Sequence, residues 1–433
     1  MYSFKGTTAF ESTDSLLRYQ AGLLRECIDH ISDRSPFYKR LLSGLSSSDV
    51  SSIEDIRKLP ITTKEDLQRD NWAFLCVPRE GISEVVATTG TTGRPVFFAL
   101  TERDLVRLAE NEKRAFEGMS VGRADIVQVA VTLDNLFIAG LAYYSGLKAL
   151  GAGIIRSGPQ NPKRQLELLA SLEAGVIIAV PSFMLHIGKE AEKAGISLSG
   201  LNVKKALLIG ETIRSTDLSS NSLGTSVEKM WGVETFSTYG ITEASTAFYE
   251  CASHKGLHAH PDFVYAEILD DDGNPLPAGQ PGELTVTTFQ VEGMPLLRYR
   301  TGDVTFMLEG KCECGSNAQR LGPVVGRKSH RLKVKGTTVY PGAIENGLHA
   351  VDGVVNFQIC ASSDTEGSDM ILVRVGSEDV SQGFIERVRS SIRSYARVTP
   401  LVEVLAPSAV EALLFEGGRR KKMTFVDTRV SKG

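Results

Sequence analysis

Apolar residues follow a helical period near the start of the chain and then switch to a strand-and-helix alternation. Residues 16–31 repeat apolar side chains at helical spacing, and 51–59 and 62–67 read as short capped helices within a helical start at 1–80. Short apolar runs at 83–87, 127–131, 153–156, 175–180 and 205–209 alternate with predicted helices at 101–116, 138–150, 163–172 and 182–194. This alternation predicts an α/β fold with a doubly wound, mostly parallel sheet and ligands at the carboxyl ends of its strands.

The pattern changes again after about residue 263. Short strands with turn signals predict a small antiparallel, barrel-like unit. Strands at 354–361, 370–375 and 401–405 with a helix at 382–396 then predict a small α+β domain. We expect a large N-terminal domain at 1–327, with an α/β part at 81–250 and a barrel-like part at 251–327, and a small mobile C-terminal domain at 328–433.

Composition narrows the class of protein. A chain of 433 residues is too long for a single compact core, so we expect two or more domains. Its content of 42% hydrophobic and 23% charged residues is ordinary for a globular protein. The net charge of −4 argues against a nucleic-acid partner. Since no run of about 18 apolar residues and no signal peptide occur, we expect a cytoplasmic protein with no membrane partner.

Four segments carry the chemistry. The first, Thr88-Thr89-Gly90-Thr91-Thr92-Gly93, can cradle phosphate because glycines admit an anion and Thr hydroxyls donate to its oxygens. The second, Tyr239-Gly240-Ile241-Thr242-Glu243, offers an aromatic face for a base, a hydroxyl for phosphate and a carboxylate for Mg²⁺. The third, Tyr299-Arg300-Thr301-Gly302-Asp303, ends in a carboxylate that can accept two hydrogen bonds from a ribose diol. The fourth is Gly326-Arg327. Each has a plainer interpretation as a packed or capped turn.

In this order the segments resemble the core motifs of adenylate-forming enzymes, and over residues 37–429 the chain most resembles the phenylacetate–CoA ligase family. The resemblance implies an ATP-dependent acid–CoA ligase that works through an acyl-adenylate on an aromatic acid. It assigns Tyr239 and the turn Gly210-Glu211-Thr212 to adenine, Thr242 to phosphate and Glu243 to Mg²⁺. Asp303 and Arg327 are assigned to the ribose and phosphate of ATP or AMP.

The resemblance extends to residues outside these segments. Lys421 matches the family's C-terminal lysine, which would bridge the attacking carboxylate and the α-phosphate, and Arg94 stands where the family usually has Lys. The acyl pocket would involve Phe137, Ala139, Gly140 and Tyr143. The family commonly has paired Asp at the hinge; here we expect the hinge at Ser329 and interpret His330 as a surface residue.

A second constellation consists of Cys251, His258, Cys312 and Cys314. The tight Cys312-Glu313-Cys314 turn can present two thiolates to one metal, and Cys251 with His258 would complete a Cys₃His zinc site. Some phenylacetate–CoA ligase relatives have similar positions. His254 and His260 are competing ligands, and reduced thiols without metal are the alternative.

Two other functions stay open at this stage. One is adenylation of an acid or amino acid followed by loading of a carrier protein. The other is a zinc-stabilised nucleotide-binding protein without ligase turnover, which the loss of the hinge acids and the loop Lys would favour. The sequence also leaves a homodimer open.

Overall fold

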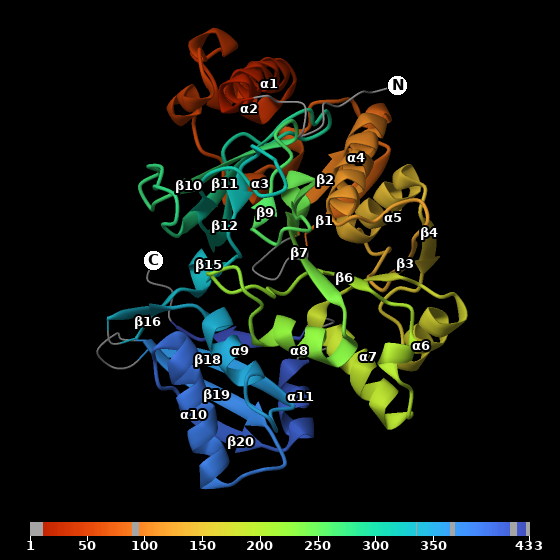
Figure 1. Cartoon of the computed structure of the whole chain (residues 1–433). Coiled ribbons are helices and arrows are strands. Elements are labelled where there is room, and N and C mark those ends of the chain that lie inside the picture. The colour runs from red at the N-terminus through yellow and green to blue at the C-terminus, as the bar shows by residue number, and fades with distance from the viewer. Residues whose placement is uncertain (1–11, 89–94, 335, 364–368, 416–421, 430–433) are drawn as a thin grey trace. The chain divides into compact units, whose positions relative to one another are not determined.

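The computed structural model describes residues 12–88, 95–334, 336–363, 369–415 and 422–429 (Figure 1). The α-helices are α1 (Thr13–Arg34), α2 (Pro36–Leu41), α3 (Lys64–Arg69), α4 (Glu102–Gly118), α5 (Ile138–Leu150), α6 (Pro162–Ser171), α7 (Pro181–Lys193), α8 (Ser222–Trp231), α9 (Pro341–His349), α10 (Gln382–Ala396) and α11 (Pro407–Leu414). Several short 3₁₀ helices accompany them, among them η3 (Ile53–Lys58), η7 (Thr242–Ala244) and η8 (Lys328–His330).

The strands that form the two larger sheets of the first half and middle of the chain are β3 (Ile126–Val129), β4 (Gly153–Arg156), β5 (Val176–Ala179), β6 (Lys205–Leu208), β7 (Glu234–Ile241), β8 (Thr246–Glu250), β9 (Leu257–His258), β10 (Val264–Leu269), β11 (Gly282–Thr288), β12 (Tyr299–Thr305), β13 (Met307–Leu308), β14 (Arg320–Leu321) and β15 (Gly326–Arg327). The others are β1 (Glu84–Ala87), β2 (Phe97–Leu100), β16 (Leu332–Val334), β17 (Thr337–Val339), β18 (Asn356–Ser363), β19 (Asp369–Gly376), β20 (Leu401–Leu405) and β21 (Phe425–Asp427).

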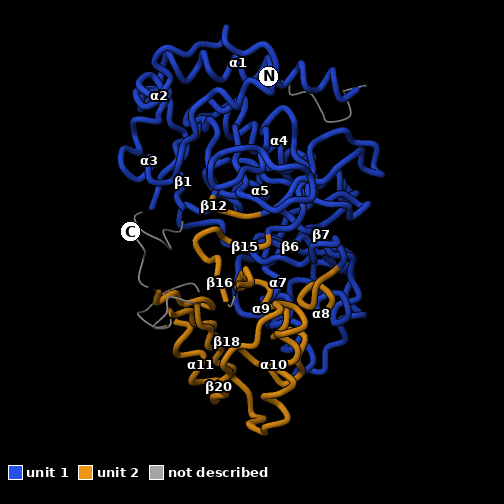
Figure 2. The backbone as a smooth tube through the Cα atoms, turned by 90° about the vertical axis from the view of Figure 1, so that its left-hand side faces the viewer, with its two compact units in different colours: residues 1–219, 226–301, 305–324 blue, residues 220–225, 302–304, 325–433 orange. Residues whose placement is uncertain are grey.

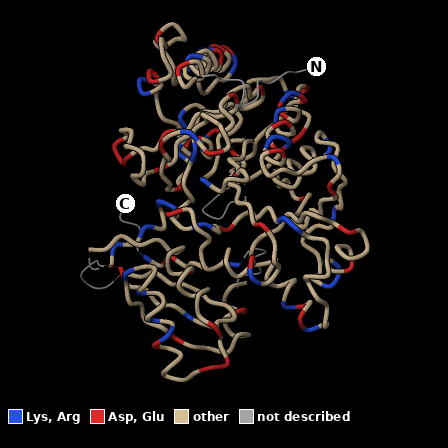
Figure 3. The backbone as a smooth tube through the Cα atoms, in the orientation of Figure 1, with Lys and Arg blue, Asp and Glu red and all other residues tan. Residues whose placement is uncertain are grey.

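The chain divides into two compact units, coloured separately in Figure 2. Unit 1 comprises residues 1–219, 226–301 and 305–324, and unit 2 comprises 220–225, 302–304 and 325–433. Lys and Arg are interspersed with Asp and Glu along the described backbone (Figure 3). Among the described helices, none combines the length and apolar character that crossing a bilayer requires.

Unit 1 is built around a nine-stranded sheet with the order β13-β14-β9-β8-β7-β6-β5-β3-β4. The pairs from β4 to β7 are parallel, as predicted, and those from β7 to β13 are antiparallel. Alternate residues of β5 enter different cores: Val176 and Ile178 pack with α4 and α5, whereas Ile177 and Ala179 pack with α6, α7 and α8. Helices therefore cover both faces of the sheet, which is the predicted doubly wound arrangement.

Two features of unit 1 differ from the expectation. The predicted strand at 83–87 forms as β1, but it pairs with β2 in a separate antiparallel sheet. The region predicted to be one barrel-like unit is divided, since β10, β11 and β12 belong to a four-stranded sheet with β15 while β13 and β14 join the nine-stranded sheet. The two-residue strands β13 and β14 are too short to show a strand period in the sequence.

Unit 2 has the predicted α+β character. Its sheet has the order β20-β19-β18-β21. Phe357, Ile359 and Ala361 of β18 face a core shared with α9 and α10. On the opposite side of β18, the Gln358 amide donates to the carbonyl oxygen of Leu413 in α11 at 3.2 Å. The helices therefore cover both faces of this sheet too.

Candidate active site

The turns predicted to bind a nucleotide follow neighbouring strands of the large sheet. Gly210 follows β6 and η7 follows β7, and β6 and β7 pair in parallel. Gly210 has φ +79°, which favours glycine because it has no Cβ. Since parallel strands end at the same edge of a sheet, both turns belong to the edge at which ligands of doubly wound folds bind.

The predicted phosphate loop is described only at its first residue. Thr88 is buried; its N–H donates to the Val96 carbonyl oxygen at 2.9 Å, and its hydroxyl oxygen accepts from the Val96 N–H at 3.1 Å. Thr88 thus fixes the base of the loop with both groups. The rest of the predicted loop, Thr89, Gly90, Thr91, Thr92, Gly93 and Arg94, lies outside the described residues, as does Lys421.

The second predicted adenine turn is tied to a neighbouring helix. The Glu211 carboxylate accepts hydrogen bonds at 2.8 Å from both the N–H and the hydroxyl of Ser182, in the first turn of α7. The Thr212 hydroxyl donates to the carbonyl oxygen of Val324 at 3.4 Å. These contacts fix the turn through its side chains and leave Gly210 exposed.

The turn after β7 presents the other predicted residues. Tyr239 is half-buried with its ring 5.9 Å from that of Phe248, and Thr242 and Glu243 lie in η7. The Tyr299 hydroxyl donates to Glu243 Oε1 at 3.3 Å, and Lys64 Nζ lies 3.8 Å from the same oxygen. A carboxylate is an appropriate ligand for Mg²⁺, so the donor chemistry of Glu243 fits that ion.

An ion pair that the sequence did not predict lies just beyond the predicted adenine turn. Arg214 Nε and Nη2 donate to the two oxygens of Glu250 at 2.9 and 3.0 Å, and both side chains are buried. The second Glu250 oxygen also accepts from the N–H of Ser237 in β7 at 2.8 Å. Burial alone would raise the pKa of Glu250, but hydrogen bonds from His254 and Arg214 hold it below its ordinary value.

The predicted acyl-pocket residues surround the start of α5. Tyr143 is buried, and Phe137 and Ala139 are half-buried against the same core. A Cβ on Gly140 would collide with the carbonyl oxygen of Thr132, so this glycine permits the close approach of helix and loop. Burial raises the pKa of Tyr143 well above its ordinary value, with the nearby Glu112 adding to the effect.

Four residues for which the sequence predicted a role or a position belong to the described part of unit 2. Asp303 is buried and pairs with Arg327, whose Nε lies 3.2 Å from Asp303 Oδ1. Ser329 is exposed in η8. His330, interpreted as a surface residue, is half-buried, with its ring 4.8 Å from that of Phe425. Burial lowers the pKa of His330, so its imidazole is neutral near pH 7.

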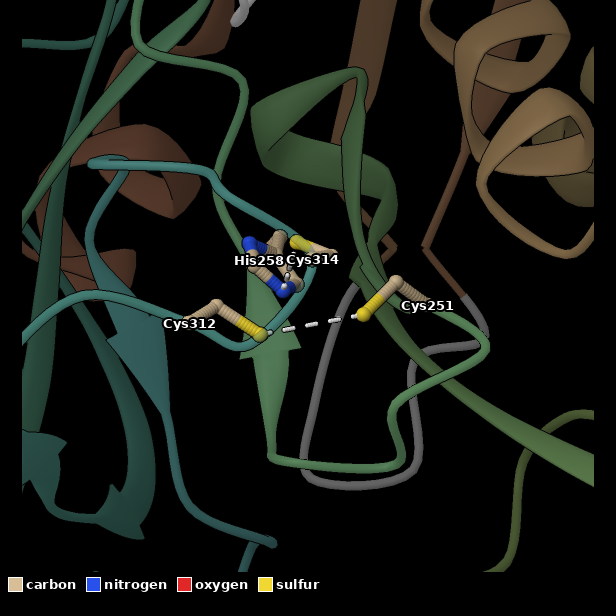
Figure 4. Close-up of side chains that lie close together, drawn as sticks. All are labelled: Cys251, His258, Cys312 and Cys314. Atoms are coloured by element: carbon tan, nitrogen blue, oxygen red, sulfur yellow. Dashed lines mark hydrogen bonds between the residues drawn. The ribbon is translucent and has the colours of Figure 1, made fainter.

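The four residues predicted to hold zinc converge in unit 1 (Figure 4). Their ligand atoms all lie within 4.8 Å of one another; Cys251 Sγ is 3.9 Å from Cys312 Sγ, and Cys314 Sγ is 3.8 Å from His258 Nε2. Such separations fit a tetrahedron with metal–ligand bonds of roughly 2.0–2.3 Å. Burial lowers the pKa of His258 to about 4, which keeps the imidazole in the neutral form that binds metals.

The competing histidines lie in other surroundings. His254 Nε2 is 3.0 Å from Glu234 Oε1, and its Nδ1 is 3.5 Å from Glu250 Oε2. His260 is fully buried, with its ring stacked on Tyr249 at 4.7 Å. Neither side chain belongs to the four-residue group.

Known proteins share this fold and much of this sequence. The family model of the AMP-binding enzymes matches residues 48–293. A phenylacetate-coenzyme A ligase of Thermus thermophilus is 31% identical over 438 residues, which cover 95% of this chain and 96% of that protein. The phenylacetate-coenzyme A ligase of Escherichia coli K12 is 29% identical over 346 residues, which cover 78% of this chain and 77% of that protein. The predicted resemblance is confirmed.

Solved structures agree on the architecture. A 2-hydroxyisobutyryl-CoA ligase in the postadenylation state matches with a TM-score of 0.84 at 21% identity, covering 96% of this chain and 90% of that chain. At this identity the likeness bears on the fold alone, and it confirms the predicted α/β class.

Proposed function

We propose that this chain, which belongs to the AMP-binding enzyme family and is an AMP-forming acid–CoA ligase, activates an aromatic acid of the phenylacetate or benzoate type. The observation that carries the proposal is the 31% identity to a phenylacetate-coenzyme A ligase along 95% of the chain. The aromatic surroundings of α5, Phe137 and Tyr143, support a flat acyl group there.

The reaction has two steps. An oxygen of the substrate carboxylate attacks the α-phosphorus of ATP, forming the acyl-adenylate while the bond to pyrophosphate breaks. The thiol of CoA then attacks the acyl carbon, loses its proton and displaces AMP, which leaves the thioester. The acid is already ionised near neutral pH, so no protein base is needed for the first step.

We assign the nucleotide to the two strand-end turns of unit 1. Gly210, Glu211 and Thr212 would border the adenine. The ring of Tyr239 would stack against the adenine, with Gly240 beside it, and the Thr242 hydroxyl would donate to phosphate. Glu243 would hold Mg²⁺, which when bound neutralises phosphate charge. The loop from Thr88 to Gly93 would cradle the phosphates, with Arg94 supplying a cation.

The other segments that resemble the family motifs would contribute further contacts. Asp303 would accept from the ribose diol and Arg327 would donate to ribose or phosphate. Lys421 would bridge the substrate carboxylate and the α-phosphate, and Ser329 would be the hinge of a C-terminal domain at 328–433. We also propose that Cys251, His258, Cys312 and Cys314 hold one structural zinc ion, because four protein ligands leave no open position.

The test measures AMP and pyrophosphate release with Mg·ATP and a panel of aromatic, fatty and amino acids, each with and without CoA. We expect turnover that requires an aromatic acid and CoA. Pyrophosphate release independent of CoA would favour a carrier protein as acceptor, and AMP binding without any release would favour a nucleotide-binding protein without turnover.

A matched pair of variants tests the lysine assignment. Lys421→Ala should abolish adenylation and spare thioester formation from a supplied acyl-adenylate, because the lysine acts only at the α-phosphate. Lys422→Ala, one residue along, should retain both steps. Equal adenylation by the two variants would contradict the role of Lys421.

A further inference from the structure

Arg107 of α4 is a buried cation with four hydrogen bonds. The side chain is 1% exposed, and burial lowers its pKa to about 10, so it stays protonated at pH 7. Its guanidinium donates to the carbonyl oxygens of Phe289 (2.8 Å), Ser245 (2.8 Å) and Phe263 (2.6 Å) and to the hydroxyl of Thr246 (2.7 Å). All four acceptors are neutral groups from other parts of the chain.

Two of these acceptors follow directly after the turn that carries Thr242 and Glu243. Ser245 ends η7 and Thr246 begins β8. Ser245 is buried with φ +46°, a left-handed conformation that costs a residue other than glycine roughly 1–2 kcal/mol. That conformation persists only where surrounding contacts hold it, and the Arg107 bond to the Ser245 carbonyl oxygen is such a contact.

A buried guanidinium is costly unless its hydrogen bonds are satisfied. A guanidinium, unlike an apolar side chain, can hold several carbonyl groups at once, because its N–H donors form a rigid planar fork. Here the fork joins the end of the η7 turn to the start of β10 and the end of β11. Arg107 thus bonds to the main chain two residues after Glu243, although it stands 136 positions before Glu243 in the sequence.

We propose that Arg107 is a positioning residue for the nucleotide site, holding the η7 turn so that Thr242 and Glu243 face Mg·ATP. This inference rests on the proposed assignment of these two residues to the triphosphate and its metal. Arg107 contacts neither substrate nor metal in this role; it acts through the main chain of Ser245 and the hydroxyl of Thr246.

Arg114 provides a matched control on the same helix. It is also buried, and its guanidinium lies 4.9 Å from the Phe263 ring, compared with 4.7 Å for that of Arg107. However, Arg114 bonds to Asp262 at 2.9 and 3.0 Å and to Glu110 at 2.9 Å. Replacing Arg114 removes these hydrogen bonds and should disturb the core, but the hydrogen bonds of Arg107 to the end of the η7 turn should remain.

The experiment measures binding of Mg·ATP and of AMP by calorimetry, together with KM for ATP and kcat, for Arg107→Lys and Arg114→Lys. Lys keeps the charge but cannot span four acceptors. We expect Arg107→Lys to weaken Mg·ATP binding at least tenfold with a much smaller effect on AMP. Arg114→Lys should stay within about twofold of the wild type for both ligands, although both variants lower the melting temperature.

A double-variant cycle links the effect to the turn. In a Glu243→Gln background, Arg107→Lys should weaken Mg·ATP binding little further, because residues that act as one unit are not additive. Thr246→Val, with Thr246→Ser as its control, removes a single acceptor and should shift Mg·ATP binding in the same direction if Arg107→Lys does not fold.

The outcomes separate the two levels of the proposal. A wild-type protein that does not bind Mg·ATP would overturn the proposed nucleotide site and with it this inference. A wild type that binds Mg·ATP, with Arg107→Lys no weaker than Arg114→Lys or with fully additive losses in the Glu243→Gln background, would overturn the positioning role alone.

Discussion

A buried carboxyl group in α4 gives a sharp prediction about stability and pH. Glu112 is 2% exposed. Its Oε1 accepts from the Asn111 amide at 3.0 Å, while Oε2 has no hydrogen-bond partner among the described residues. Burial raises the pKa of Glu112 from 4.5 to about 7, because the charged form loses its hydration. The folded protein therefore resists ionisation of this group.

The size of the effect follows from the two pKa values. A folded-state pKa of about 7 against an unfolded value of 4.5 corresponds to about 3 kcal/mol. Because the folded pKa is raised, this stability is present below pH 4.5 and is lost as the pH rises to about 7. Glu112→Gln mimics the neutral carboxyl, so it should be near neutral at pH 4.5 and stabilise the protein by up to about 3 kcal/mol at pH 8.5.

The assay is urea unfolding followed by tryptophan fluorescence at both pH values. The protein's two tryptophans, Trp72 and Trp231, both belong to unit 1, which also contains Glu112, so the signal reports on the relevant unit. Glu117→Gln is the control, since that side chain is 51% exposed on the same helix. A Glu112→Gln effect that is the same at pH 4.5 and 8.5 would refute the reasoning, as would equal pH dependence in the control.

Two further predictions concern the region around β8. Glu250→Gln removes the buried counter-charge of Arg214 and leaves the partly exposed Glu228, 3.2 Å from Arg214 Nη1, so it should cost roughly 2 kcal/mol in urea unfolding. Glu167→Gln in an exposed pair should cost less than about 1 kcal/mol, and equal costs would contradict the buried-pair argument. Cys251→Ser should reduce zinc per chain, measured by atomic absorption, to below half of the wild-type value, while Cys360→Ser should retain it; undiminished zinc in Cys251→Ser would exclude this ligand set.

The sequence predicts those parts of the fold that depend on periodicity. The helices at 138–150 and 382–396 and the strands at 153–156 and 401–405 have the predicted bounds. Their apolar positions repeat at 3.6 or 2 residues, so one local pattern decides each element. The convergence of Cys251, His258, Cys312 and Cys314 was predictable for a different reason, because closely spaced Cys with His is a typical pattern of zinc ligands.

Side-chain partners far apart in the sequence could not be predicted in this way. Glu211 was expected to contact adenine, and its carboxylate also accepts from Ser182 in α7. Arg214 and Glu250 are 36 residues apart, and either one alone reads as an ordinary surface charge. Only the tertiary fold brings such groups together. The sequence offered one signal for this ion pair: Arg214 comes four residues after Gly210, which follows the strand β6.

The strand β8 shows why these distant partners matter for the proposed site. At its start, Arg107 bonds to Ser245 and Thr246; at its end, Glu250 pairs with Arg214, and the next residue, Cys251, belongs to the four-residue group proposed to hold zinc. Because successive side chains of an extended chain point to opposite sides, the ion pair and the proposed zinc group can fix the same strand end from two directions. β8 pairs along its length with β7, which carries Tyr239. The proposed nucleotide turn is thus supported by a strand held at both ends, and the two cations that hold it, Arg107 and Arg214, lie outside the segments from which the nucleotide site is proposed.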